Sequence, residues 1–287
     1  MTTIQLEERH AETARSTAPW ALEKLPPFPM VATRLLAVLN KENPEISEVG
    51  RTIAADPVFA TRVLQMANSP LFALERQIRT LSHAIIVLGL ARVKAIAVTR
   101  ALGDFVGSAL KDKALRACWQ HSLAGALIAA KLAHACKMNQ DFAYVAALLR
   151  DIGRLALLVN FPESYANLLA VSQENAYDLM DVERDLFDID HCEAGTWLME
   201  KMPFPPEFVE VVARHHQASI PEPFRMVHLV RIADRLADAL GFATWVAGEP
   251  PVFEQVLADL PAAARFRFEA DPEELKAEIT AKIQTWS

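Results

Sequence analysis

The sequence predicts an all-α fold, a multi-helix bundle with an N-terminal helical subdomain. Alanine and leucine favour helices and dominate the hydrophobic residues that make up 52% of the chain, while Gly is scarce at 9 residues. The 17 prolines fall mainly between apolar segments, where helices stop or start. Within these segments apolar side chains recur every three or four positions, and no convincing alternating pattern indicates a strand.

The N-terminal half, 19–110, is predicted to contain about five short helices. Residues 1–18 are polar and aperiodic, which indicates a flexible tail. Residues 25–29 hold three prolines, and proline disfavours helix in the residue before it, so we expect an extended entry segment. The expected apolar faces are Met30, Leu35, Leu36 and Leu39; Val49 and Ile53 behind a Ser47 cap; Phe59, Val63, Leu64 and Ala67 between the start signal Asp56-Pro57 and the stop Asn68-Ser69-Pro70; Ile85, Ile86 and Leu88; and 91–102.

The second half, 111–240, has longer predicted helices and follows a junction at 107–113. We expect one buried helix over 142–160 and another over 182–201. Pro203, Pro205 and Pro206 separate the latter from the next helix. The remaining apolar faces are Leu115, Trp119, Leu123, Leu127 and Ala130; Tyr165 and Leu168; Phe208, Val212 and His215; and 226–240.

Residues 241–287 are predicted to form a C-terminal helical extension. Asp271-Pro272-Glu273-Glu274 reads as a capping box with proline at the first helical position, so a terminal helix should follow. The extension has apolar content that either packs on its own domain or forms a dimer contact, at Trp245, Phe253, Phe266 and Phe268.

Charge and cysteine usage limit the function classes. The net charge of -7 argues against general nucleic-acid binding, which needs clustered Lys and Arg. Cys118, Cys136 and Cys192 are isolated and odd in number, as expected of buried free thiols in a reducing compartment. The N-terminus lacks a signal-peptide core, and charges interrupt the longest apolar run, 142–161, so we predict no membrane span. A cytoplasmic protein is expected.

Polar residues recur on otherwise apolar helix faces and form the candidate site. A carboxylate on such a face is costly unless it is paired or bound to a metal. Imidazole and carboxylate groups together suit iron, manganese or zinc. One histidine on an apolar face is usually a core residue, but the ordered set indicates a site: His121, Asp151, His191, His215, His216 and Asp234.

The chain resembles the HDOD family, the HD-related output domains of bacterial signalling, over roughly 22–235. The resemblance is carried in the first half by 25–29, Ile53-Ala54-Ala55-Asp56-Pro57, Arg62-Val63-Leu64-Gln65-Met66-Ala67-Asn68-Ser69, Ile78-Arg79-Thr80-Leu81-Ser82-His83-Ala84-Ile85 and Leu88-Gly89. In the second half it is carried by Trp119-Gln120-His121-Ser122, 147–155, Pro162-Glu163, His191-Cys192-Glu193-Ala194-Gly195 and His215-His216. The resemblance implies an HD-like bundle, a role in signal transduction and usually no demonstrated catalysis.

The same resemblance implies a damaged metal site. In the hydrolytic relatives seven positions would supply metal ligands, namely those of His121, Arg150, Asp151, His191, His215, His216 and Asp234. Six of the seven residue types survive here, and the departure is arginine at 150, where an HD doublet has histidine. The Gly-Tyr-Pro signature of one hydrolytic branch is absent too. We therefore expect no metal and no catalytic residue; if a metal is present, its ligands would be His121, Asp151, His191, His215 and Asp234.

Arg150 decides between two hypotheses. Pointing inward, its guanidinium would pair with Asp151 and Asp234 and replace a metal electrostatically, but it could not activate water. Pointing outward, it would reach solvent from the edge of a helix. The sequence alone leaves both orientations open.

Three functions follow from these observations. The leading interpretation is a non-catalytic signalling or regulatory module that works through signalling proteins or a nucleotide second messenger. The alternative is a metal-dependent phosphohydrolase acting on a phosphodiester such as cyclic di-GMP, with iron, manganese or zinc as cofactor. The third is a helical scaffold that forms a homodimer through 241–287.

Overall fold

The computed structural model describes residues 18–26, 30–39, 41, 44–68, 77–202, 204–217, 223–246 and 248–284. These residues form helices joined by turns, with no strand among them, so the predicted all-α fold is confirmed. Residues 1–17 of the expected tail lie outside the described residues. So do Pro27, Phe28 and Pro29 of the entry segment, the expected stop at Ser69-Pro70, and Pro203.

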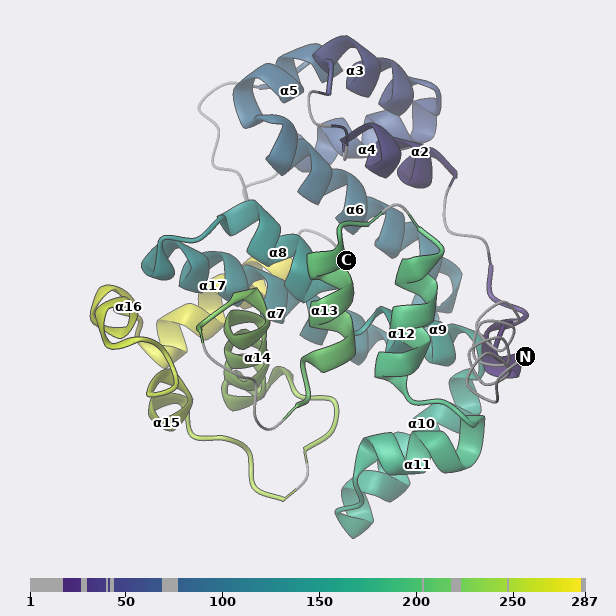
Figure 1. Ribbon diagram of the computed structural model, residues 1–287, viewed down its shortest axis with the longest axis vertical. Coiled ribbons are helices and arrows are strands. Elements are labelled where there is room, and N and C mark those ends of the chain that lie inside the picture. Colours follow the sequence, from purple (N-terminus) through teal and green to yellow (C-terminus); the bar gives the residue numbers. More distant parts are fainter. Residues whose placement is uncertain are drawn as a thin grey trace, which may run out of the picture.

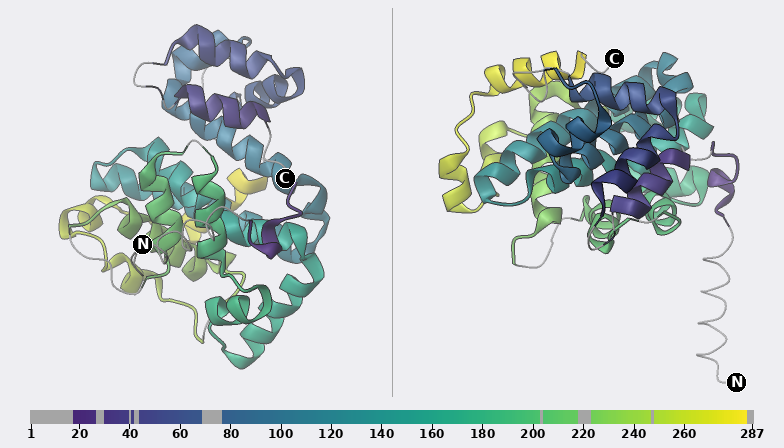
Figure 2. Two further views of the ribbon diagram at one scale, coloured as in Figure 1. Left: turned by 45° about the vertical axis from the view of Figure 1, so that its right-hand side comes forward. Right: turned by 90° about the horizontal axis from the view of Figure 1, so that it is seen from above.

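An N-terminal lobe is built from the first helices. A short turn of helix, η1 (Trp20–Leu22), precedes it. In Figure 1 and in the left view of Figure 2 the helices α2 to α5 stand above the main body, and α6 runs from this lobe into the body. The five helices predicted for this half are α2 (Met30–Leu39), α3 (Ile46–Ala54), α4 (Pro57–Ala67), α5 (Leu81–Leu88) and α6 (Leu90–Val106).

Of the two helix caps predicted for this lobe, one is present and one is not. The Asp56 carboxylate accepts hydrogen bonds from the backbone N–H groups of Val58 and Phe59, at 2.9 and 3.0 Å, as predicted. The prediction that Ser47 caps α3 is wrong. The helix begins at Ile46, two residues before the start that a Ser47 cap implies, and the Ser47 hydroxyl donates instead to the carboxylate of Glu45.

Helix α6 contributes to two hydrophobic cores. One core fills the lobe, and the other fills the main body. Opposite faces of α6 enter them, so this helix joins the two halves. The lobe core takes Ile96, Ala97 and Ala101, and the body core takes Ala95, Val98 and Leu102. Neighbouring Ile86 and Val87 of α5, in contrast, are exposed, although Ile86 was predicted to face inward.

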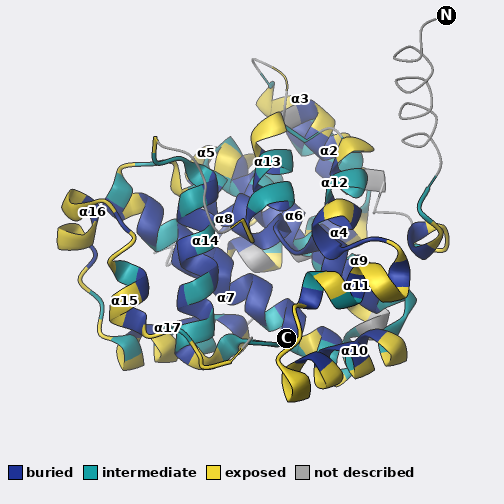
Figure 3. Ribbon diagram, turned by 60° about the horizontal axis from the view of Figure 1, so that its bottom comes forward, coloured by how far each residue is buried: buried dark blue, intermediate teal, exposed yellow. Residues whose placement is uncertain are grey.

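The main body surrounds α7, which packs against α8 and α14, while α12 packs against α9 and α13. Figure 3 shows α7 buried along most of its length. The elements are η3 (Gly107–Lys111), α7 (Lys113–Cys136), α8 (Gln140–Leu149), α9 (Ile152–Asn160), α10 (Pro162–Asn175), α11 (Leu179–Phe187), α12 (His191–Glu200), α13 (Pro206–Arg214), α14 (Met226–Ala237) and η4 (Asp238–Phe242).

Two predicted long helices are each a pair of helices, so the prediction of single helices over 142–160 and 182–201 is wrong. The first run breaks between α8 and α9 at Asp151, whose φ of -98° and ψ of 21° leave the helical region. The second breaks after α11, where Asp188 is left-handed with φ 58° and Asp190 caps α12. Apolar periodicity continues through both breaks because the paired helices enter the same core.

The C-terminal extension packs on the main body. It consists of α15 (Phe253–Leu257), α16 (Ala262–Arg267) and α17 (Pro272–Gln284), and α16 and α17 both contact α7. Phe253 and Ile279 are buried in the body core, whereas Phe266 is 81% exposed. The Asp271 carboxylate accepts from the N–H groups of Glu273 and Glu274, so the predicted cap of the terminal helix is present.

Within the described ranges no single helix is long and apolar enough to cross a membrane. Helices α5 and α6 taken together are long and apolar enough by length and composition alone. The chain bends by 120° between these two helices.

Two glycines let α9 and α12 touch through their backbones. A Cβ built on Gly153 would lie 2.0 Å from the carbonyl oxygen of His191 and 2.4 Å from the nitrogen of Gly195. Both distances are far inside van der Waals contact, so neither helix tolerates a side chain at Gly153 without moving. This crossing fixes the start of α9, with Asp151 before it, against the start of α12.

Gly153→Ala should therefore destabilise the protein by about 1–3 kcal/mol or more, because the added methyl group forces two backbones apart. The free energy of unfolding from urea denaturation measures this. Gly107→Ala is the matched control, since a Cβ there meets nothing within 4 Å. A loss of stability for Gly153→Ala no larger than for the control would contradict the close crossing.

Candidate functional site

The seven candidate residues come from five segments and gather at the centre of the main body. Their side chains are buried apart from His216, which is exposed. They form two groups that share Asp151. The segments are α7 with His121, the break between α8 and α9 with Arg150 and Asp151, the start of α12 with His191, the turn after α13 with His215 and His216, and α14 with Asp234.

The first group is organised around Arg150, which points inward with no exposed surface. Its Nε donates to Oδ1 of Asp234 at 2.7 Å, and its Nη2 lies 2.7 Å from the same oxygen. Its Nη1 donates to the Ala147 carbonyl at 2.7 Å, and its Nε lies 3.3 Å from Oδ2 of Asp151. Of the two orientations that the sequence left open, the outward one is excluded.

The Arg150 guanidinium also uses a lone pair of His121. Its Nη2 lies 3.0 Å from Nδ1 of His121, and because a guanidinium only donates, that Nδ1 must accept. The proton of a neutral His121 is then on Nε2, which lies 2.9 Å from Oδ1 of Asp238. Nδ1, the imidazole nitrogen that lies 3.8 Å from Oδ2 of Asp151, is therefore occupied by arginine and is not available to a metal.

Mutual charge stabilises this group against the cost of burial. Burial alone would lower the pKa of Arg150, but the Asp234 and Asp151 carboxylates raise it above its ordinary value. Burial would likewise raise the pKa of Asp234, but Arg150 and then His121 hold it below its usual range. Arg150 and Asp234 are therefore both charged and form a buried ion pair.

A glycine opposite Arg150 makes room for the guanidinium. A Cβ on Gly125 of α7 would lie 2.6 Å from Nη1 of Arg150 and 3.0 Å from its Cζ. Gly in the middle of a helix costs up to about 1 kcal/mol relative to Ala, so its presence there needs a reason. The reason here is the space that Arg150 fills.

The second group is organised around His191, whose ring is set by Glu183. Nδ1 of His191 donates to Oε2 of Glu183 at 2.6 Å, and the backbone N–H of His191 donates to the same oxygen at 2.8 Å. The Tyr165 hydroxyl donates to the other oxygen of Glu183. Burial would lower the pKa of His191, but Glu183 raises it to about 9. This arrangement turns Nε2 of His191 toward Asp151, at 3.8 Å from Oδ1.

His215 presents its Nε2 to the same oxygen. Its Nδ1 donates to the Val212 carbonyl at 2.9 Å, and its Nε2 lies 3.5 Å from Oδ1 of Asp151. Both of these facing atoms are buried and lack a hydrogen-bond partner among the described residues. Nη2 of Arg154 lies beside these atoms, 3.6 Å from Oδ1 of Asp151 and 3.4 Å from Nε2 of His191.

The two groups differ in their fitness for a metal. In the first, the guanidinium occupies the space between His121, Asp151 and Asp234, so a metal would have to displace it. In the second, donor atoms of Asp151, His191, His215 and His216 lie within 4.8 Å of one another. Carboxylate and imidazole ligands with a carboxylate behind one histidine are typical of zinc, manganese and iron sites. The ligand types of the second group therefore fit one metal ion, which would have to displace Arg154 from Nε2 of His191.

A cavity of about 210 Å³ adjoins both groups. His121, His215, His216 and Asp234 line its inner side, and Arg154, Arg231 and Arg235 add positive charge to its wall. The indole N–H of Trp245, also in this wall, is buried without a hydrogen-bond partner in the described part of the chain. These donors suit an anionic group.

Four residues of this centre are not predicted from the sequence: Gly125, Arg154, Asp238 and Glu183. Gly125 carried a signal, because glycine interrupts an alanine- and leucine-rich helix. Arg154 carried one too, because it is a second arginine in the most apolar run of the chain. Asp238 follows Asp234 by one helical turn. Glu183 carried none, since Val182-Glu183-Arg184-Asp185 reads as an ordinary solvated helix face.

The comparison with models of protein families identifies one family. The sequence model of the HDOD domain matches residues 25–218. A crystal structure of an HDOD domain protein of unknown function from Geobacter sulfurreducens is similar over 98% of this chain and 95% of its own, with a TM-score of 0.69 and 24% identity.

Two further relatives extend the comparison. The structure of a proposed phosphohydrolase from Shewanella amazonensis SB2B has a TM-score of 0.67 and 22% identity, and it covers 93% of this chain and 95% of its own. An uncharacterised protein of Treponema pallidum is 22% identical over 74% of this chain. This chain spans only 41% of the length of the Treponema protein. At these identities the structural matches show the fold.

The fit between Gly125 and Arg150 can be tested by a double-mutant cycle. Gly125→Ala should destabilise the protein by about 1–3 kcal/mol, because the methyl group meets the guanidinium. Arg150→Leu should destabilise it by about 3–5 kcal/mol, because Asp234 loses its partner in a buried site. Adding Gly125→Ala to Arg150→Leu should cost much less than adding it to the wild type.

The measurement is urea denaturation of the four proteins, with Gly103→Ala as the matched control. A Cβ on Gly103 meets only a side-chain atom of Trp119 at 3.8 Å, so this change should be neutral or slightly stabilising in both backgrounds. Additive effects of Gly125→Ala and Arg150→Leu would show that the two residues do not share one space.

Proposed function

This chain belongs to the HDOD domain family, and on that basis we propose that it is a non-catalytic signal-transduction module. The observation that supports the proposal best is the position of Arg150. Its guanidinium donates to Asp234, lies 3.3 Å from Asp151 and uses the inward lone pair of His121. These are the groups that would otherwise hold a cation.

Arginine at this position would remove metal-assisted hydrolysis from the first group. A bound metal lowers the pKa of a coordinated water and generates hydroxide near neutral pH. A guanidinium supplies positive charge and hydrogen bonds but has no coordination site for water. The protein would keep a positive charge between the carboxylates but would lose the ability to activate water.

The retained centre would serve as a hub between helices. Arg150 joins the end of α8 to α14 through Asp234 and to α7 through His121. Buried ionic groups of this kind fix one arrangement of helices, because any other leaves a charge unpaired. A module of this type would act through a protein partner or a nucleotide in the cytoplasm, with the anion-suited cavity beside the centre available to a ligand.

A second candidate function rests on the second group. Asp151, His191, His215 and His216 fit one metal ion, and Asp151 and His215 each offer a buried atom that has no hydrogen-bond partner among the described residues. One ion there, of iron, manganese or zinc, would make the protein a phosphohydrolase of a phosphodiester with a reduced ligand set. Arg154, beside Asp151, would then contact the phosphate.

An activity assay separates the two candidates. Purified protein with added Mn²⁺, Fe²⁺ or Zn²⁺ should not hydrolyse a panel of phosphodiesters that includes cyclic di-GMP, because the first group holds arginine in place of metal. Metal-dependent turnover in the wild type that is lost in His215→Ala would overturn the leading proposal and support the second candidate.

Substitution of Arg150 should change the amount of metal bound per chain, which mass spectrometry measures. Arg150→His restores an imidazole at the doublet and should raise the bound metal toward one additional ion per chain, because a ligand replaces a charge. Arg150→Gln is the matched control, since it removes the charge but adds no comparable ligand. Metal content in Arg150→His no higher than in the wild type would indicate that the site is lost for reasons other than Arg150.

A further inference from the structure

The cavity of about 210 Å³ beside the centre is lined in part by the start of the C-terminal extension. Thr244, Trp245 and Val246 line it together with Arg154 of α9. The backbone N–H of Val246 donates to Oε1 of Gln173 at 2.9 Å, which attaches this segment to α10. The cavity therefore lies between the HD-like half and the segment that leads to α15.

Two N–H groups of residues that line this cavity are buried and have no acceptor within the described part of the chain. One is Nε of Arg154, and the other is the indole Nε1 of Trp245. The Arg154 side chain is 5% exposed, and its Nη2 lies 3.6 Å from Oδ1 of Asp151. A buried donor without an acceptor is costly, so an acceptor in the cavity would stabilise both groups.

The charge of the lining favours a negative acceptor over a neutral one. Two carboxylates line the cavity, and both already have partners. Oδ1 of Asp234 accepts from Nε of Arg150 at 2.7 Å, and Oδ1 of Asp238 lies 2.9 Å from Nε2 of His121. Three arginines line the same cavity: Arg154, Arg231 and Arg235. A hydrogen bond from a guanidinium to an anion is about twice as strong as one between neutral groups.

The size of the cavity limits the ligand. A volume of about 210 Å³ is below the roughly 300–1,000 Å³ of sites for drug-sized molecules. The cavity therefore suits an ion or a single phosphoryl group better than a whole nucleotide. A tetrahedral oxyanion has oxygens pointing in several directions, so it can accept from donors on different segments.

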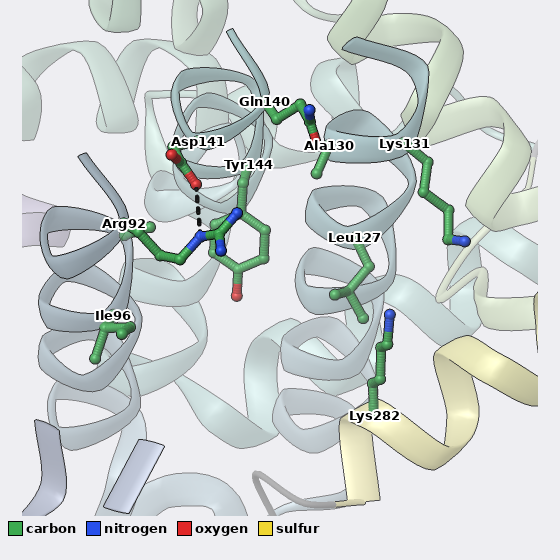
Figure 4. Close-up of a pocket in the computed structure, with 10 residues that line it drawn as sticks. Arg92, Ile96, Leu127, Ala130, Lys131, Gln140, Asp141, Tyr144 and Lys282 are labelled. Atoms are coloured by element: carbon green, nitrogen blue, oxygen red, sulfur yellow. Dashed lines mark ion pairs between the residues drawn. The ribbon is translucent and has the colours of Figure 1, made fainter. Parts of the chain in front are cut away.

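A larger cavity, of about 360 Å³, is a poorer anion site because its charged groups have partners. It lies between α6, α7, α8 and α17, and Figure 4 shows the ion pair of Arg92 with Asp141 in its lining. Nε of Arg92 lies 3.5 Å from Oδ1 of Asp141. Lys131 and Lys282 both pair with Glu278, at 2.7 and 2.6 Å. An anion there would compete with these carboxylates.

We propose that the smaller cavity binds a phosphate-type oxyanion, either free or as the terminal phosphoryl group of a small molecule. Its oxygens would accept from Nε of Arg154 and from the indole N–H of Trp245. The anion would thereby join α9 to the first residues of the C-terminal extension. This inference deepens the proposed function and rests on it, because a module that cannot activate water would bind the anion and release it unchanged.

Calorimetric titration of the full chain with inorganic phosphate, in the presence of EDTA, tests the proposal. Phosphate should bind, and Trp245→Phe should weaken the binding roughly tenfold, because the change removes one N–H group but keeps an aromatic ring. Trp197→Phe is the matched control. Nε1 of Trp197 is likewise buried without a partner among the described residues, but Trp197 does not line the cavity.

Titration with AMP separates the two sources of the anion. AMP binding at least as tight as phosphate binding would assign the site to the phosphoryl group of a larger molecule. Phosphate binding without AMP binding would assign it to the free ion. Both results support the proposal if Trp245→Phe weakens the binding and Trp197→Phe does not.

Crystals soaked in selenate locate the anion, since selenate is a tetrahedral dianion and selenium scatters anomalously. The expected peak lies within hydrogen-bond distance of Arg154 and Trp245. Four results would each overturn the proposal: no phosphate binding in the millimolar range, equal weakening by Trp245→Phe and Trp197→Phe, selenate peaks only elsewhere, or phosphate binding only when Mn²⁺ replaces EDTA.

Failure of this inference is distinguishable from failure of the proposed function. Metal-dependent turnover of a phosphodiester would overturn the proposed function, whereas absence of phosphate binding in EDTA would overturn only this inference.

Discussion

The buried pair of Arg150 and Asp234 is the interaction on which the centre of this molecule depends. An arginine with no exposed surface is tolerated only where its charge and its donors are matched, because an unpaired charge in the interior is very costly. Asp234, Asp151, His121 and the Ala147 carbonyl provide that match. Each comes from a segment that must therefore keep its position relative to the others.

Glycines allow the helices to approach closely enough for this match. Gly125 leaves the volume that the guanidinium fills, and Gly153 lets the backbones of α9 and α12 meet beside Asp151. The second group then follows from the same crossing, since His191 is the first residue of α12. Arg150 and the glycines at 125 and 153 thus determine the geometry of both groups. The first group holds the guanidinium, and the second has ligand types that fit a metal.

The sequence predicted the helical architecture and the family, because apolar periodicity and the ordered polar motifs are local signals. It did not predict the breaks at Asp151 and Asp188. The two helices of each pair bury their apolar faces in one core, so the apolar periodicity of the sequence continues across each break. It left the orientation of Arg150 open, because that depends on Gly125, 25 positions away in the chain. Glu183 was not predicted because its hydrogen bond to His191 depends on how α11 and α12 are placed relative to each other, which the local sequence does not indicate.

Anomalous diffraction from crystals grown with Mn²⁺ tests the central claim most directly, because it locates both the metal and the arginine. The predicted result is continuous side-chain density for Arg150 between His121, Asp151 and Asp234, with no anomalous peak at that position. A peak coordinated by those three residues, with the Arg150 side chain displaced from them, would contradict the account.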